Sequence, residues 1–425
     1  MATSILCQGS AAGAWALGRM VGRDLDDDAP RVEFEVSSGV RRDTLAEYID
    51  VRMIDGGSVY VPDFVRTDLF RNPASWYTLT CAFEHEGIRV RFCVVCKTVD
   101  LLHKGEHRKL LRTLLFALDC VVHLRRSEAS TADVAGDAIS VTCLLLRRKR
   151  RMPSEIHGDG DGVLGPEHVN AGVTDLNAKS VLVYRNQHVH KVLIHEIVHC
   201  MAVDSPLHAY ATRENRRAER DICRALGYTS HSGVGCNESF TETLACYWQL
   251  FLAAGSRRVS VDAGDGTKEL CATIVRLWRQ ELRNYKAVCH LLMRHFRHRV
   301  HNANADSNIT RRDRPWHRAN TNTNTNTNTN TNTNTNPLEA VAALRAEENT
   351  HVLAYFFGKT ALWERLDEVP VIFGSGPRDP EVGRFWRVYR KALLGEHEGG
   401  FWREYVSVPS PGRIAANLTM TSVHP

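Results

Sequence analysis

His195, Glu196 and His199 lie within the apolar stretch HKVLIHEIVHCMAVD, residues 190–204. Because residues four apart share one face of a helix, the two imidazoles can bind the same metal ion. Neutral histidine nitrogen is a ligand that zinc prefers, and the adjacent glutamate would lie beside the metal without having to bind it. A glutamate in that place can act as the general base for a metal-bound water. The spacing therefore predicts a zinc site with its own base on one helix.

A catalytic zinc site also needs a third protein ligand and an open position. The continuation HExxHxxGxxH is absent, because no glycine stands at the required place and His208 is out of register. The stretch NESFTETLA offers Glu238 and Glu242, which are four apart and so on one face of a second predicted helix. The alternative interpretation is a helix with incidental surface histidines. The apolar neighbours VLI and IV argue against it, since buried histidines and a buried glutamate without partners are costly.

The two motifs together resemble a known family. HEIVH at 195–199 followed by NESFTE at 237–242 resembles the gluzincin group of zincin metallopeptidases, of which thermolysin is a member. The resemblance covers residues 138–254. The gap between the motifs is longer than in thermolysin and has room for an extra helix at 211–226. The overall pattern also resembles uncharacterised zincins of large DNA viruses.

The resemblance implies a role for each motif residue. His195, His199 and Glu238 would bind zinc, Glu196 would be the general base, and Glu242 would accept a hydrogen bond that orients a ligand histidine. The implied activity is zinc-dependent hydrolysis of a peptide or protein substrate, in which Glu196 takes a proton from a zinc-bound water and passes it to the leaving amine. The alternative is a catalytically silent zincin-fold protein that binds a protein partner. The intact Glu196 argues against it, because a pure binding protein does not need the base.

The resemblance also implies a strand edge that binds extended substrate by main-chain pairing. We expect this edge at HVNAGVT, residues 168–174, rather than at SVLVYR, residues 180–185. Asn170 and Gly172 are then the candidates for substrate binding, and Gly172 would let a substrate backbone approach closely. An ordinary inner strand is the open alternative.

A group that stabilises the developing oxyanion is expected as well. Tyr228 and His231 lie in the loop just before NESFTE and are the candidates. The residues alone do not choose between them.

The residues before the motif helix show alternating strand and helix patterns. WYTLTCAFEHEGIRVRFCVVC at 76–96 predicts a β-hairpin that turns at Glu86-Gly87. Apolar residues at helical spacing over 107–124 predict a helix. Further strands are expected at 138–146, 168–174 and 180–185. The order β-β-α-β-β-β-α predicts a mixed unit that ends in the motif helix. Later helices are expected at 211–226, 237–254, 267–296 and 337–366.

We therefore expect an α+β, zincin-like fold with a mixed-sheet N-terminal subdomain carrying the active-site helix, followed by a mainly helical C-terminal subdomain. The expected divisions are a poorly ordered extension at 1–40, the α/β subdomain at 41–204, a helical subdomain with the third ligand at 205–300, a disordered insert at 301–337, and a helical continuation and tail at 338–425. The insert contains strict Thr-Asn alternation, which has no apolar residue to bury.

Charge gives little support to a nucleic-acid partner. The 425 residues contain 54 Lys and Arg against 49 Asp and Glu, a net charge of +5. A third interpretation, a nucleic-acid-associated protein, would use RRKRR at 147–151 and the basic segment 276–299. The near-balanced total argues against it. Because RRKRR follows a predicted buried strand, a solvent-exposed strand end is favoured over an import signal or a phosphate patch.

The chain shows neither a membrane span nor a secretory signal. It has no apolar run of 18 residues, and its apolar N-terminal patch lacks a preceding basic region. We therefore expect a cytoplasmic protein, in the host cell or virion if the source is viral. Twelve scattered cysteines then predict reduced thiols. Cys93 and Cys96 form one CxxC inside a predicted strand, for which a structural role is favoured.

Overall fold

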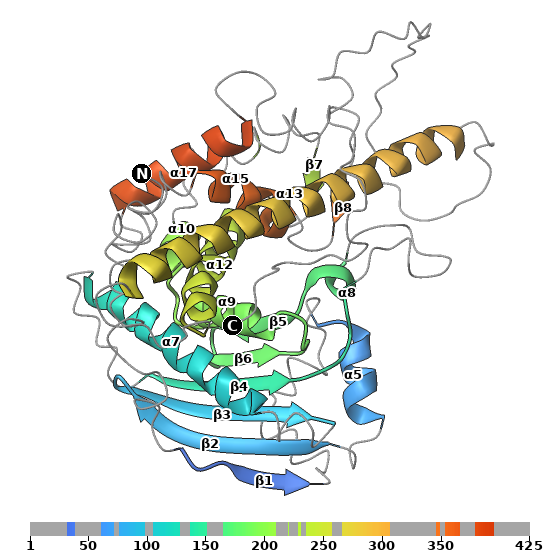
Figure 1. Ribbon diagram of the computed structural model, residues 1–425. Helices are drawn as coiled ribbons and strands as arrows, with labels where there is room; N and C mark the ends of the chain where they lie inside the picture. Colours follow the sequence, from blue (N-terminus) through green and yellow to red (C-terminus); the bar gives the residue numbers. More distant parts are fainter. Residues whose placement is uncertain are drawn as a thin grey trace, which may run out of the picture.

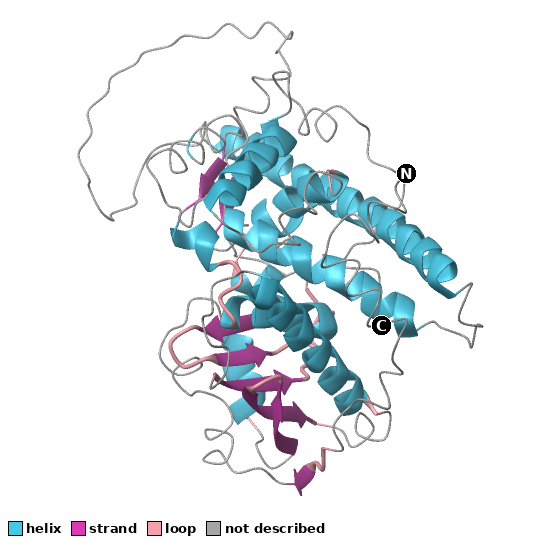
Figure 2. Cartoon of the chain, turned by 90° about the vertical axis from the view of Figure 1, so that its left-hand side faces the viewer, coloured by secondary structure: helices cyan, strands magenta, loops and turns pink. Residues whose placement is uncertain are grey.

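The computed structural model describes residues 32–38, 61–71, 76–97, 105–127, 137–150, 165–209, 220, 228–230, 235–256, 266–306, 346–348, 353–365 and 379–394. A six-stranded mixed sheet lies at one end of this part of the chain, and most of the helices lie at the other (Figures 1 and 2). The structure therefore has a mixed α+β architecture with mostly helical content, as expected.

The sheet has the strand order β1-β2-β3-β4-β6-β5. Its strands are β1 (Glu35–Ser38), β2 (Tyr77–His85), β3 (Ile88–Cys96), β4 (Ala138–Leu144), β5 (Gly172–Asp175) and β6 (Ser180–Val183). The predicted hairpin of β2 and β3 is confirmed, and its turn residues Glu86 and Gly87 have φ angles of 53° and 82°. β4 runs parallel to both β3 and β6, whereas β5 pairs antiparallel with β6. The expected β-β-α-β-β-β-α order is therefore observed from β2 to the motif helix, apart from one extra helical turn before β5.

Helices cover both faces of the sheet. They are α5 (Asp63–Phe70), α7 (Glu106–Ser127), α8 (Pro166–Val169) and α9 (Val189–Cys200). Alternation along β3 sends Val94 to the core beneath α7 and α9, and Cys93 and Val95 to the smaller core beneath α5. Figure 1 shows α7 crossing the front of the strands and α5 beside them.

The helical part packs onto α9. Its elements are α10 (Ser205–Ala209), α12 (Cys236–Ser256), α13 (Gly266–Asp306), the π-helix η3 (Leu353–Gly358), α15 (Lys359–Glu364) and α17 (Asp379–Leu394), with the short parallel pair β7 (Tyr228–Ser230) and β8 (Ala346–Glu348). Helix α12 contacts α9 on one side and α13, η3 and α15 on others. It is buried along nearly its whole length, so it connects the sheet-bound helix to the C-terminal elements.

Several sequence expectations need correction or lie outside the described residues. Residues 35–38 form β1, so this part of the expected extension at 1–40 belongs to the sheet. The expected strand at 168–174 is wrong at its start, because Pro166 opens the one-turn helix α8 and β5 begins only at Gly172. The expected single helix at 337–366 is also wrong, because residues 346–348 form the strand β8 and helical structure begins only at Leu353 among the described residues. The expected helix at 211–226, apart from Arg220, and the Thr-Asn tract lie outside the described residues.

The cysteines that the structure describes are all free and buried. Cys93 and Cys96 lie within β3, and burial raises the pKa of the Cys93 thiol to about 12. A thiol with so high a pKa is unreactive at neutral pH, which favours the structural role. No described helix is long and apolar enough to cross a membrane.

Candidate metal centre

The motif lies on α9, which is buried on almost every side. Of its twelve residues, His199 alone is partly exposed. The helix rests on β5 and β6 and packs against α7 and α12. This burial positions the His195 and His199 side chains rigidly toward α12 rather than toward solvent.

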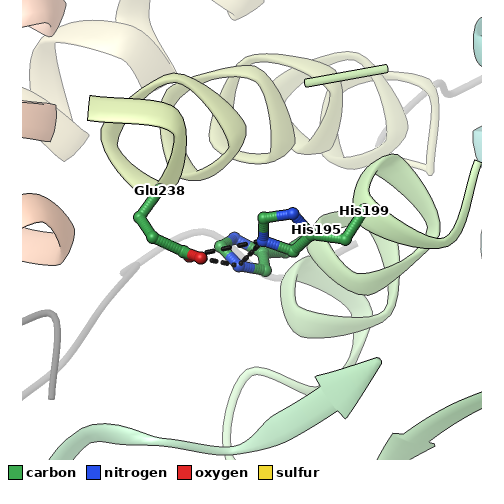
Figure 3. A group of neighbouring side chains, drawn as sticks. All are labelled: His195, His199 and Glu238. Carbon is green, nitrogen blue, oxygen red and sulfur yellow. Dashed lines mark hydrogen bonds and ion pairs between the residues drawn. The ribbon is translucent and has the colours of Figure 1, made fainter. Parts of the chain in front are cut away.

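His195, His199 and Glu238 form a tight triangle of possible ligand atoms (Figure 3). The Nε2 atoms of the histidines are 3.0 Å apart, and Glu238 Oε2 lies 3.3 Å from His199 Nε2 and 3.4 Å from His195 Nε2. Four ligands arranged tetrahedrally about 2.0–2.1 Å from a zinc ion lie about 3.3–3.4 Å from one another. The observed separations therefore fit three corners of a zinc tetrahedron.

The other ring nitrogen of each histidine faces a carboxylate. His199 Nδ1 lies 2.8 Å from Asp204 Oδ2, and His195 Nδ1 lies 3.1 Å from Glu242 Oε2. The second contact is an ion-pair distance, in which the N–H direction is not aligned for a hydrogen bond. Carboxylates on Nδ1 favour the tautomer that leaves Nε2 free to bind a metal. Both histidines can therefore bind the same metal ion through Nε2.

Glu242 is fully buried and is held by two lysines. Lys191 Nζ donates to Glu242 Oε2 at 2.6 Å, and Lys359 Nζ donates to Glu242 Oε1 at 3.2 Å. Burial alone would raise the pKa of this carboxyl, but Lys191 and Lys359 hold it well below its usual value. Glu242 therefore stays ionised beside His195, although it is shielded from water.

The triangle itself carries opposed charges. Burial would lower the pKa of His199, but Glu238 and Asp204 raise it well above its usual value. Burial would likewise raise the pKa of Glu238, and His199 with His195 holds it well below its usual value. Without a metal the site is therefore an ion pair, and a divalent cation would take the place of the proton.

The Glu196 carboxylate is held by the edge strand and lines the same pocket as His195. Thr174 Oγ1 donates to Glu196 Oε2 at 2.7 Å, and burial raises the pKa of this carboxyl. A Cβ at Gly172 would lie 2.7 Å from Glu196 Oε1 and 2.8 Å from Val192 Cγ1. The absent side chain of Gly172 therefore makes room for the Glu196 and Val192 side chains of α9, and its expected role in admitting a substrate backbone stays a prediction.

The remaining candidates divide between the described and undescribed parts of the chain. β5 is an edge strand, and Asn170 lies just before it and lines the pocket beside His195. The Tyr228 backbone begins β7, but its side chain and all of His231 lie outside the described residues.

Sequence reasoning did not identify Tyr355, which lies more than a hundred residues beyond the motifs. Its ring makes an edge contact with His195 at a centroid distance of 5.8 Å, and it lines the same pocket as Glu196. Burial and the neighbouring carboxylates raise its pKa well above the usual value, so its hydroxyl stays protonated. No local motif marks this residue, because only the packing of η3 against α12 brings it to the site.

Comparisons with known proteins give this chain no relative. Neither a protein-family model, nor a curated protein, nor a solved structure matches it. The functional argument therefore depends on the geometry of the site.

Proposed function

We propose that this protein is a zinc-dependent peptidase with a zincin-like fold. The observation that supports it most strongly is the triangle of His195 Nε2, His199 Nε2 and Glu238 Oε2, whose separations of 3.0–3.4 Å suit a tetrahedral zinc ion. Three protein ligands leave the fourth position for a water or a substrate, which is the arrangement of a catalytic site rather than a structural one. When bound, zinc would polarise the peptide carbonyl and acidify a water molecule.

The residues around the triangle supply the other functions that hydrolysis needs. The Glu196 carboxylate takes a proton from the attacking water and later delivers it to the amine that leaves. Burial raises its pKa, which brings the group closer to the working pH of a general base. Thr174 holds one carboxylate oxygen at 2.7 Å, so the other is directed toward the pocket.

Tyr355 is proposed as the donor to the developing oxyanion. It lies in the same pocket as Glu196 and contacts the ring of His195. A protonated phenol that is already in place in a largely buried site can donate a strong hydrogen bond, because little of the surrounding structure has to rearrange as charge develops. The edge of β5, to which no described strand pairs on its outer side, would hold the extended substrate by main-chain pairing.

Zinc content and turnover test this proposal together. Wild-type protein purified without chelators should hold about one zinc per chain, and Glu238→Ala should hold none. Glu196→Gln should keep its zinc while cleavage of a proteome-derived peptide mixture falls by about 10²–10⁴-fold. If the wild type holds no metal, the peptidase proposal fails and α9 is a scaffold in a partner-binding protein.

A further inference from the structure

The basic run at 147–151 is not exposed at every residue that the structure describes, which corrects the expected solvent-exposed strand end. Arg147, Arg148 and Lys149 are exposed, but Arg150 is 0% exposed. Its backbone N–H donates to Gln187 Oε1 at 2.8 Å. The chain after β4 therefore turns inward at this residue and carries a guanidinium into the interior.

Only one of the three guanidinium nitrogens of Arg150 donates a hydrogen bond to a described residue. Its Nε donates to the carbonyl oxygen of Val169 at 2.6 Å. Nη1 and Nη2 are both buried and have no hydrogen-bond partner among the described residues. Burial and the neighbouring Arg185 lower the pKa of Arg150 to about 9, so it is still charged at neutral pH. A buried charge with four unpaired N–H groups is costly unless something else completes it.

Arg150 lines the pocket of the metal centre. The pocket is also lined by Gly172, Lys191, His195, Glu196 and Tyr355, and its cavity volume is only about 20 Å³. This is less than the roughly 300–1,000 Å³ of pockets for drug-sized ligands. The space therefore suits one small group of a larger substrate.

The charges around the pocket indicate which chemical group of a substrate Arg150 can bind. Glu242 attracts the charge of Arg150 at a distance, but its hydrogen bonds go to Lys191 and Lys359 and leave Nη1 and Nη2 of Arg150 unpaired among the described residues. Two parallel N–H donors on a guanidinium match the two oxygens of a carboxylate. A phosphate, with its higher negative charge, would be repelled more strongly by Glu196 and Glu242.

We propose that Arg150 is a specificity-determining residue that binds a carboxylate of the substrate beside the metal centre. Resting on the proposed peptidase function, this inference makes the substrate a peptide that carries a carboxylate next to the scissile bond. The carboxylate is either an Asp or Glu side chain or the free C-terminus.

Three small probes distinguish these sources by direct binding. N-acetylglutamate α-amide carries only a side-chain carboxylate, N-acetylglutamine only a terminal one, and N-acetylglutamine amide neither. Their dissociation constants are measured by ligand-observed NMR on the full chain, as purified and after chelation of metal. At least one charged probe should bind about tenfold more tightly than the neutral probe. The charged probe that binds more tightly shows whether the site takes a side-chain carboxylate or a C-terminal one.

Variants locate the binding at Arg150. Arg150→Gln should remove the preference for the charged probe. Arg150→Lys should keep a smaller preference, because lysine retains the positive charge but lacks the two parallel N–H donors of the guanidinium. Lys149→Gln removes the same charge from an exposed neighbour and should behave as wild type. Equal binding of all three probes to the wild type overturns the inference even if Arg150→Gln does not fold. An unchanged preference in folded Arg150→Gln overturns it too.

The binding measurement does not depend on catalysis. Preferential binding that survives chelation, in a protein that cleaves no peptide, would support the carboxylate site and refute the peptidase. Cleavage without any acidic or C-terminal preference, together with equal probe binding, would refute the site and leave the peptidase standing.

Discussion

Asp204 Oδ2 lies 2.8 Å from His199 Nδ1, although the end of α9 separates the two residues. The helix stops because Ala202 adopts a left-handed conformation with φ of 55°. The N–H of Val203 then donates to the carbonyl of Val198 at 3.0 Å, a closure typical of helix C-termini. The tight turn folds the buried Asp204 back onto the histidine and directs His199 Nε2 toward Glu238.

Asp204→Asn should weaken zinc binding by about 10–100-fold, because the carboxylate that orients His199 and raises its basicity is lost. Competition with a chromophoric chelator measures this affinity. Asp63→Asn, on the exposed first turn of α5, is the control for loss of one negative charge. Wild-type affinity in Asp204→Asn would show that this carboxylate only closes the helix.

Tyr355→Phe should lower kcat by about 10²–10³-fold with KM and zinc content nearly unchanged, because the hydroxyl acts only as charge develops on the carbonyl oxygen. The ring contact with His195 is kept in this variant. Steady-state kinetics on a cleaved peptide separate kcat from KM. A rise in KM alone would instead assign Tyr355 to substrate binding.

Gly172→Ala should reduce kcat/KM by about 100-fold, because a misplacement of about 1 Å of a catalytic group has such an effect. The new Cβ would displace Glu196 and Val192, which lie 2.7–2.8 Å from its position. Zinc content should not change. Gly105→Ala is a control for backbone strain without a clash at the site, because its Cβ would meet no atom within 4 Å but its φ of 67° disfavours any side chain; it should lower stability and leave kcat/KM nearly unchanged. Full activity in Gly172→Ala would show that α9 can shift without cost.

Lys359→Met should lower both stability and zinc affinity. It removes a donor from the fully buried Glu242, and a hydrogen bond to a charged group contributes about 1.5–3 kcal/mol. Lys286→Met breaks the partly exposed pair with Glu364, and its effect should stay within about 1 kcal/mol. Denaturant unfolding and chelator competition measure the two quantities. Equal effects of both substitutions would contradict the coupling of α15 to the metal centre.

The ion pair of metal-free protein predicts a pH window for its stability. The pKa of Glu238 is lowered, so its contribution is present above the usual value of 4.5 and is lost as pH falls. The pKa of His199 is raised, so its contribution is complete below the usual value of 6.5 and is lost as pH rises through the higher folded value.

The stability difference between chelated wild type and chelated Glu238→Gln should therefore be largest from about pH 4.5 to 6.5 and decline on both sides. Denaturant unfolding across this range measures it. A difference that does not change with pH would contradict the paired state of His199 and Glu238.

Local patterns were enough to predict the β2–β3 hairpin and the helices α7, α9, α12 and α13. Alternating apolar residues predict the hairpin at Glu86-Gly87, and helical spacing predicts α7 and α12, because these signals depend on neighbours within a few residues. The same reasoning failed at Pro166, where a single turn of helix replaces a strand. It also failed at Arg150, because nothing local distinguishes this buried arginine from the three exposed basic residues before it.

The sequence by itself determined that His195, Glu196 and His199 share a helix, and that Glu238 and Glu242 share another. The packing of α12 on α9 decides which ring nitrogen of His195 each carboxylate contacts. Glu238 lies near Nε2, and Glu242 lies near Nδ1. Lys359, Tyr355 and Arg150 also lie at the site only because of the tertiary structure. Helix and strand periodicity act over a few residues, whereas these contacts join segments far apart in the chain, and only the burial of a common core brings such segments together.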